Sequence, residues 1–165
     1  HGSGFFVGNN GYLLTNAHVV GDSKSVQIIT SSGMEIEGQV IRKSKSRDVA
    51  LIKVPLKITN SLYLKFQIPD IASDVYAAGT PIDEALKTTV TKGIISNIRV
   101  DNASGLKFIQ ADASISPGNS GGPLFDKFGN VIGISVAKYN TNSAEGLGLF
   151  IPLKDAFNSI KLLIE

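Results

Sequence analysis

One short segment of the chain surrounds a serine with glycines, an arrangement suited to nucleophilic chemistry. Residues 116–123 read SPGNSGGP, and three glycines lie close to Ser120. Glycine adopts positive φ and permits close approach of another backbone, so a tight loop here could expose the Ser120 hydroxyl. Acyl transfer also needs donors for the negative charge that develops on the carbonyl oxygen. We expect the N–H groups of Gly118 and Ser120 to form this oxyanion hole, with Asn119 holding the loop between them. The alternative is a flexible Gly–Ser turn.

A serine hydroxyl is a poor nucleophile without a general base. The chain has two histidines, and His1 stands at the start of the sequence. The other, His18, lies in the segment TNAHVV, after the apolar run that ends at Leu14. Imidazole is the side chain that most often serves as general base near neutral pH. A lone histidine is more often a core residue, but the serine loop favours the catalytic interpretation of His18.

The third residue of such a site is a carboxylate that accepts a hydrogen bond from the imidazole. Asp48 opens the apolar run DVALIKV and is either a buried acceptor or a solvated turn residue. Asp22, Asp74 and Asp112 are rivals. Asp22 is close to His18 in sequence and Asp112 is close to Ser120, yet residue spacing alone excludes neither of them.

Short strands are the elements that must position these residues. Apolar and β-branched residues recur in brief runs between Gly, Asn, Asp and Ser, and such runs predict strands. Strands are expected at residues 5–7, 12–15, 26–30, 35–42, 48–54, 74–78, 88–100, 106–110, 131–137 and 146–151. The stretch 55–73 has no sustained period and is expected to be a linker. After Pro152, one helical face is predicted from Leu153, Ala156, Phe157, Ile160, Leu163 and Ile164.

The composition limits the function classes. The chain has 165 residues, 42% of them hydrophobic, and a net charge of +2, with lysines scattered along it. These values indicate a globular protein and argue against a nucleic-acid or membrane-surface partner. The chain contains no cysteine, which excludes disulfides, thiolate metal sites and a cysteine nucleophile. No apolar run is long enough to span a bilayer, and no signal peptide is evident. Many short strands with one terminal helix favour an all-β barrel or sandwich.

Three motifs together resemble the trypsin-like serine proteases. TNAHVV, DVALIKV and SPGNSGGPL follow the order His, Asp, Ser of that family, and the opening GSGF and the segment QADASI resemble its HtrA/Deg branch. The resemblance implies two six-stranded antiparallel β-barrels and a C-terminal helix. Residues 1–72 would form the first barrel with His18 and Asp48, and residues 73–165 the second barrel with Ser120.

The resemblance also implies a substrate pocket. Its walls would be formed by Ser114, Ile115, Ile134, Ser135, Val136 and Ala137. No aspartate stands at the position expected for the base of a trypsin-like pocket, and no histidine follows His18. We therefore expect a small or medium aliphatic residue at P1, the position before the scissile bond.

Partners and location follow from the same resemblance. The family cleaves unfolded or extended polypeptide in protein quality control, without a cofactor, most often in the cell envelope or periplasm. Its members often form homotrimers through a segment before the first strand, and they often carry PDZ domains after the protease. This sequence contains neither segment. Loops at 81–87, 112–118 and 137–145 are expected to switch between competent and collapsed forms. Two rival functions stay open: another acyl hydrolase, and a chaperone-like module that binds peptides without cleaving them.

Overall fold

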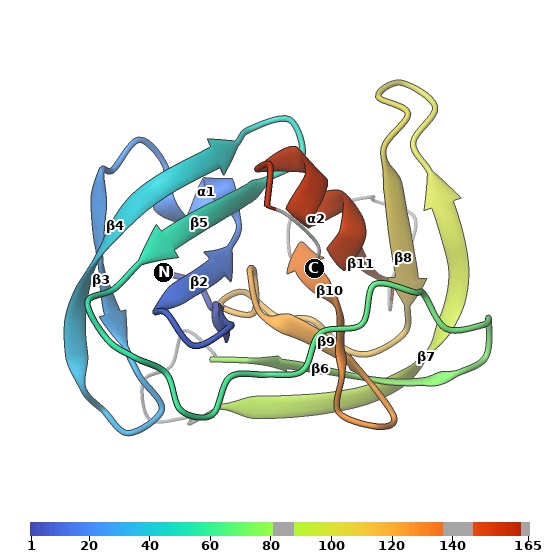
Figure 1. The fold of residues 1–165 in the computed structure, drawn as a ribbon. Helices are drawn as coiled ribbons and strands as arrows, with labels where there is room; N and C mark the ends of the chain where they lie inside the picture. Colours follow the sequence, from blue (N-terminus) through green and yellow to red (C-terminus); the bar gives the residue numbers. More distant parts are fainter. Residues whose placement is uncertain (81–87, 137–146, 163–165) are drawn as a thin grey trace.

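The computed structural model describes residues 1–80, 88–136 and 147–162. Two β-sheets stand side by side, and a helix from the end of the chain lies across them (Figure 1). The first sheet has five strands in the order β1-β2-β5-β4-β3, and the second is a closed barrel in the order β10-β11-β8-β7-β6-β9. All strand pairs within the two sheets are antiparallel.

The elements of the first sheet are β1 (Phe5–Val7), β2 (Tyr12–Thr15), α1 (Ala17–Val20), β3 (Ser25–Ile29), β4 (Glu35–Ser44) and β5 (Val49–Lys53). The barrel contains β6 (Asp74–Gly79), β7 (Thr89–Val100), β8 (Lys107–Ala111), β9 (Pro123–Asp126), β10 (Val131–Val136) and β11 (Gly148–Pro152), and α2 (Leu153–Ser159) follows it. Every predicted strand is present within about two residues of its expected ends. Ala137, Gly146, Leu163 and Ile164, which the sequence placed in the last strands and helix, lie outside the described residues.

The expectation of two six-stranded barrels is met by the second half of the chain but is not met by the described part of the first. Five strands pair in the N-terminal sheet, and no pairing between β1 and β3 closes it within the described residues. The predicted linker does not supply a sixth strand, because its backbone bonds elsewhere. Leu64 forms an isolated bridge with Val131 of the barrel, and the Ile58 N–H donates to Asn9 O at 2.9 Å.

Two elements escaped the sequence analysis, β9 and α1. β9 has only four residues and begins with Pro123, directly after the glycine-rich loop. It is too short to show the alternating pattern that predicts a strand. It pairs with both β6 and β10 and thereby closes the barrel. α1 is a single turn that carries His18, too short for a helical period to show.

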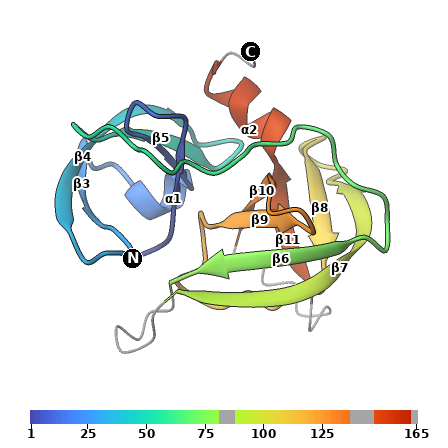
Figure 2. The same ribbon diagram turned by 60° about the horizontal axis from the view of Figure 1, so that its bottom comes forward.

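A shared apolar core joins the two sheets to α2. It contains buried side chains from β1, β2 and β5, from the barrel strands and from the helix, including Leu14, Val49, Ile134, Ile151 and Phe157. A second core fills the barrel, and a third lies between α1 and the other face of the first sheet. β5 is therefore buried on both faces, which explains its uninterrupted run VALI. Figure 2 shows the barrel and the first sheet with α2 above the seam between them.

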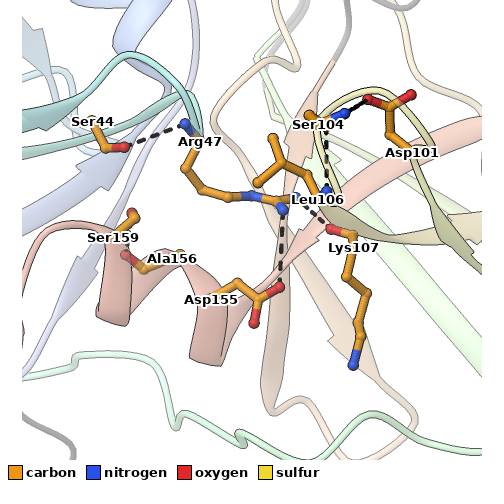
Figure 3. Close-up of polar contacts among 9 residues, drawn as sticks. All are labelled: Ser44, Arg47, Asp101, Ser104, Leu106, Lys107, Asp155, Ala156 and Ser159. Atoms are coloured by element: carbon orange, nitrogen blue, oxygen red, sulfur yellow. Dashed lines mark hydrogen bonds and ion pairs between the residues drawn. The ribbon is translucent and has the colours of Figure 1, made fainter.

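Arg47 strengthens this seam. Its side chain, 5% exposed, donates from Nη2 to Lys107 O on β8 and lies 3.9 Å from the Asp155 carboxylate on α2 (Figure 3). The guanidinium carbon also sits 4.4 Å from the centroid of the Phe108 ring. A buried charge is costly unless it is paired and hydrogen-bonded, and these contacts supply that compensation. The residue directly before Asp48 is thus fixed against the barrel. Neither helix of the described residues is long and apolar enough to cross a membrane.

Candidate active site

His18 and Asp48 are in direct contact. His18 Nδ1 lies 2.7 Å from Asp48 Oδ2, and the His18 backbone N–H donates to Asp48 Oδ1 at 2.8 Å. One carboxylate therefore fixes both the backbone and the ring of the same residue. Because the carboxylate faces Nδ1, that nitrogen carries the proton and Nε2 is left as an acceptor. Both side chains are partly open to solvent, at 31% and 24% exposed.

Local structure around β2 and β5 brings this pair together. Thr15, the last residue of β2, pairs with Ala50 on β5, so α1 begins beside the turn that precedes β5. Asn16 then donates from Nδ2 to the backbone oxygen of Asp48 at 3.0 Å. Asp48 itself has φ of +67°, a left-handed conformation that aspartate tolerates better than most residues. The hydrogen bonds from Asn16 and His18 to Asp48 hold this residue in that conformation.

The rival carboxylates are engaged away from His18. Asp22 is paired with Lys45 at 3.4 Å and lies almost fully in solvent. Asp74 faces Lys92 at 3.7 Å, and Asp112 accepts from the Ile94 N–H at 2.7 Å. Asp48 is thus the carboxylate that meets the histidine, a choice that residue spacing left open and the family resemblance implied.

The nucleophile candidate stands in a loop of two successive turns. The Asn119 N–H donates to Ser116 O at 3.0 Å, and the Gly122 N–H donates to Asn119 O at 2.9 Å. Each turn has a glycine with positive φ at its third position, +100° at Gly118 and +88° at Gly121. Positive φ at this position is the signature of type II turns. Ser120 therefore occupies the second position of the second turn.

Backbone N–H groups in this loop fall into two sets. Those of Asn119, Gly121 and Gly122 donate within the protein. The N–H groups of Gly118 and Ser120 behave differently. Among the described residues, neither donates to a backbone oxygen of a turn or loop. These two N–H groups, for which the described part of the chain shows no backbone acceptor, are the pair that the sequence assigned to an oxyanion hole.

Strand β10 bonds the loop on one side, and the residues just before α1 lie against it on the other. The Gly121 N–H donates to Ser135 O at 3.0 Å, and the Ser135 N–H donates to Gly122 O at 2.8 Å. On the other side, a Cβ placed on Gly121 would lie 3.0 Å from Asn16 N, two residues before His18. The fold therefore brings the Ser120 loop against the segment that carries the histidine, from the opposite half of the chain.

The expected substrate-pocket residues are distributed around the same loop. Ser114 is exposed, and its backbone oxygen accepts from Thr91 Oγ1 at 2.8 Å. Ile115 is half-buried, with Cδ1 2.7 Å from the point where a Cβ on Gly148 would stand. Ile134, Ser135 and Val136 are buried on β10, and Ala137 lies outside the described residues.

A cavity of about 330 Å³ lies beside the acid–base pair, between the two halves. Its lining comes from the first half through His18, Lys45, Ser46, Arg47 and Asp48, and from the second through Leu106, Phe108 and Val136. The hairpin that carries Leu106 is ordered at its tip, where Asp101 accepts from the N–H and hydroxyl of Ser104 (Figure 3). A larger hollow of about 460 Å³ over the β3–β4 ribbon is lined by none of the candidate residues.

Four residues with a place in this site were not singled out by sequence reasoning: Ser3, Asn16, Arg47 and Gly148. Their contacts join segments far apart in the chain, so no local pattern reports them. Across residues 1–80, 88–136 and 147–162, no group of three or more His, Asp or Glu side chains could hold a metal ion.

Known proteins resemble this chain in sequence. A family model described as "Trypsin-like peptidase domain" matches residues 2–134. A protein of Bartonella henselae named "Probable periplasmic serine endoprotease DegP-like" is 35% identical over 175 residues, covering 99% of this chain and 33% of that protein. "Putative serine protease HhoA" of Synechocystis is 38% identical over 171 residues, covering 94% of this chain and 41% of that protein. The chain therefore spans well under half the length of these relatives.

Solved structures resemble it in fold. "HtrA-type protease AlgW with decapeptide" matches with a TM-score of 0.86 and 33% identity, covering 97% of this chain and 50% of that one. The serine endoprotease from Yersinia pestis matches with a TM-score of 0.79 and 33% identity, covering 95% of this chain and 55% of that one.

Proposed function

The chain belongs to the trypsin-like peptidase family, on its HtrA/Deg side, and from that premise we propose that it is a serine endopeptidase using Ser120, His18 and Asp48. The observation that carries the proposal is the double contact of Asp48 with His18, through Nδ1 at 2.7 Å and the backbone N–H at 2.8 Å. This contact fixes the ring and its tautomer, which is the role of the carboxylate in a serine protease triad.

The proposed reaction begins with proton transfer. His18 Nε2 takes the Ser120 hydroxyl proton as Oγ attacks the substrate carbonyl, and a tetrahedral intermediate forms. Protonated His18 then donates to the leaving amine as the C–N bond breaks. Water repeats the sequence on the acyl-enzyme, giving the free carboxylate and restoring Ser120. Asp48 stays ionised throughout and stabilises the imidazolium.

The oxyanion of each intermediate would be held by the N–H groups of Gly118 and Ser120. Neither donates to the backbone oxygens around it in the described loop, so both are available. Removing one donor of this kind typically lowers kcat by about 10²- to 10³-fold. Asn119 lies between them, 3% exposed, with its own N–H committed to the first turn.

For the substrate, we propose an extended or unfolded polypeptide with a small or medium aliphatic residue at P1. Ile115 supports this preference, because it directly precedes the nucleophile loop and its apolar side chain packs against β11 at Gly148. The end of β10 borders the same loop, and an extended substrate would lie beside it. The cavity beside His18 would take a side chain on the N-terminal side of the scissile bond.

A role in protein quality control in the cell envelope is the broader proposal. It is supported by relatives whose names include "periplasmic serine endoprotease". Residues 1–72 would contribute the acid–base pair and residues 73–165 the nucleophile. Because the relatives are longer than this chain, PDZ or other domains and a homo-oligomer in the parent protein belong to the same proposal.

The test is cleavage of a peptide library randomised at P1, with Ser120→Ala as the matched inactive control. We expect cleavage after Val, Ala or Ile by the wild type and none by the variant. Products dominated by Lys, Arg or Glu at P1 would contradict the proposed pocket. Peptide binding by both proteins without cleavage by either would instead indicate a binding module.

A further inference from the structure

Ser3 lies two residues before β1, yet its N–H and its hydroxyl both contact the nucleophile loop. Its N–H donates to Ser120 O at 2.8 Å, and its hydroxyl donates to Gly118 O at 2.6 Å. The same hydroxyl accepts from the Thr80 N–H at 2.9 Å, and its carbonyl accepts from Thr15 Oγ1 at 2.6 Å. One residue from the N-terminal half therefore connects the nucleophile loop, the end of β6 and the end of β2.

The two carbonyls that Ser3 holds belong to Gly118 and Ser120, whose N–H groups are the oxyanion donors. Peptide units are planar, and the N–H and C=O of one unit point in opposite directions. The unit between Gly118 and Asn119 is fixed at both ends, by Ser3 on its carbonyl and by Ser116 O on its N–H. Holding the Gly118–Asn119 peptide in place limits rotation about the bonds of the Gly118 Cα. Rotation about these bonds changes the direction of the Gly118 N–H.

Such a restraint matters because the loop contains residues with little conformational preference of their own. Glycine reaches positive and negative φ with similar ease, so the peptide before Gly118 could turn over and direct its N–H away from the substrate. Type I and type II turns differ by this reorientation of the central peptide. One turn hydrogen bond leaves the loop free to shift as a whole, and the Ser3 contacts with Gly118 O and Ser120 O add anchors that restrict this movement.

We propose that Ser3 is a positioning residue whose hydroxyl holds the Gly118–Ser120 loop in the form that presents both oxyanion donors. Its effect on turnover rests on the proposed peptidase function, whereas its effect on the loop does not. The close approach depends on glycines on both sides. A Cβ on Gly121 would lie 2.3 Å from Ser3 O, and a Cβ on Gly2 would lie 3.1 Å from Ser120 O.

The test compares Ser3→Ala with Ser159→Ala. Ser159 donates its hydroxyl to Ala156 O at 2.7 Å within α2, so its variant loses the same kind of bond away from the site. We expect Ser3→Ala to lower kcat by about 10- to 100-fold, less than loss of a whole oxyanion donor, with KM changed by less than about twofold. Ser159→Ala should leave both constants unchanged. Ser3→Thr, which keeps the hydroxyl, should recover most of the loss.

Inhibitors separate a positioning effect from loss of the pocket. A peptide aldehyde forms an oxyanion on reaction with Ser120, whereas the corresponding product peptide does not. Ser3→Ala should weaken aldehyde inhibition in proportion to kcat and leave product inhibition unchanged. Equal weakening of both inhibitors, or an equal loss of kcat in Ser159→Ala, would make the effect merely structural and overturn the inference.

Hydrogen exchange tests the loop without turnover. The Asn119, Gly121 and Gly122 amides, which are hydrogen-bonded in the loop, should exchange at least several-fold faster in folded Ser3→Ala than in wild type or Ser159→Ala. Unchanged exchange and unchanged kcat would refute the role of Ser3. Faster exchange in a protein whose wild type cleaves nothing would sustain it while refuting the peptidase. Ser3→Cys, with a weaker donor, gives the same comparison if the alanine variant unfolds.

Discussion

His18 and Asp48 meet through side chains, whereas Ser120 is positioned through the backbone. The pair depends on two hydrogen bonds that one carboxylate accepts within the N-terminal half. The serine loop depends on turns, on glycines with positive φ and on contacts from β10 and from Ser3 across the seam. We infer that the His18–Asp48 pair is sensitive to changes in the chemistry of its side chains. The serine loop is sensitive instead to an added Cβ, which would push neighbouring segments apart.

The largest expected effect is loss of the nucleophile. Ser120→Ala should lower kcat by about 10⁶-fold, as for the nucleophile of another serine protease family, because no acyl-enzyme can form. Its free energy of unfolding should stay within about 0.5 kcal/mol of wild type, since the loop is held by backbone atoms. Steady-state kinetics and urea unfolding measure the two quantities. A variant that kept a hundredth of the wild-type activity would place the nucleophile elsewhere.

Asp48→Asn tests the side-chain half of the comparison. The amide oxygen can still accept from the His18 backbone N–H, but the amide nitrogen would then face Nδ1 and favour the wrong ring tautomer. We expect kcat to fall by about 10⁴-fold, with little change in KM. Kinetic measurement on the folded variant checks this, and a loss below tenfold would show that the carboxylate does not orient the base.

Gly121→Ala tests the backbone half. The new Cβ would lie 2.3 Å from Ser3 O and from Thr15 Oγ1, at a φ of +88°. We expect kcat to fall more than about 100-fold, because the displaced oxyanion donors no longer point at the substrate oxygen. The free energy of unfolding should fall by several kcal/mol.

Gly129→Ala is the matched control for that prediction. Gly129 has a similar φ of +81°, and a Cβ there would meet open space. Only the left-handed conformation is then penalised, by about 1–2 kcal/mol, and kcat should not change. Equal losses in the two variants, measured by urea unfolding, would mean that contact with Ser3 and Thr15 is unimportant.

The smallest effect concerns Asp126 and leaves activity unchanged. Burial alone would raise the pKa of this carboxyl, but hydrogen bonds from Asn130 and Phe128 and the charge of Lys65 outweigh it, so the pKa is lowered from the ordinary 3.8. A group whose pKa is lowered by folding stabilises the protein above its unfolded-state value and loses that contribution as the pH falls.

Asp126→Asn should therefore cost about 1–3 kcal/mol at neutral pH, a difference that shrinks as the pH falls below about 3.8. Urea unfolding from pH 7 down to pH 3 measures it, and kcat at pH 7 should match wild type. A constant difference across this range would show that the ionised carboxylate does not stabilise the β9–β10 turn. A changed kcat would mean that this turn and the nucleophile loop are coupled.

Much of the fold was predictable because alternating apolar runs report strands directly. His18 and Ser120 were chosen as candidates from their own surroundings in the sequence. Residue spacing alone did not separate Asp48 from Asp22; the resemblance of DVALIKV indicated Asp48, and the pairing of β2 with β5 explains how it reaches His18. The contact from Ser3 to Gly118 joins residues 115 positions apart and leaves no local trace. The same holds for Arg47, which a sequence pattern would place on the surface although it is buried at the seam.

The convergence of Ser120 and His18 is tested most directly by labelling with an active-site fluorophosphonate and locating the adduct by mass spectrometry. We expect one phosphonyl group, attached to Ser120 in wild type, no adduct in Ser120→Ala, and labelling slowed by several orders of magnitude in His18→Ala. An adduct on a different residue, or labelling of His18→Ala at the wild-type rate, would contradict it.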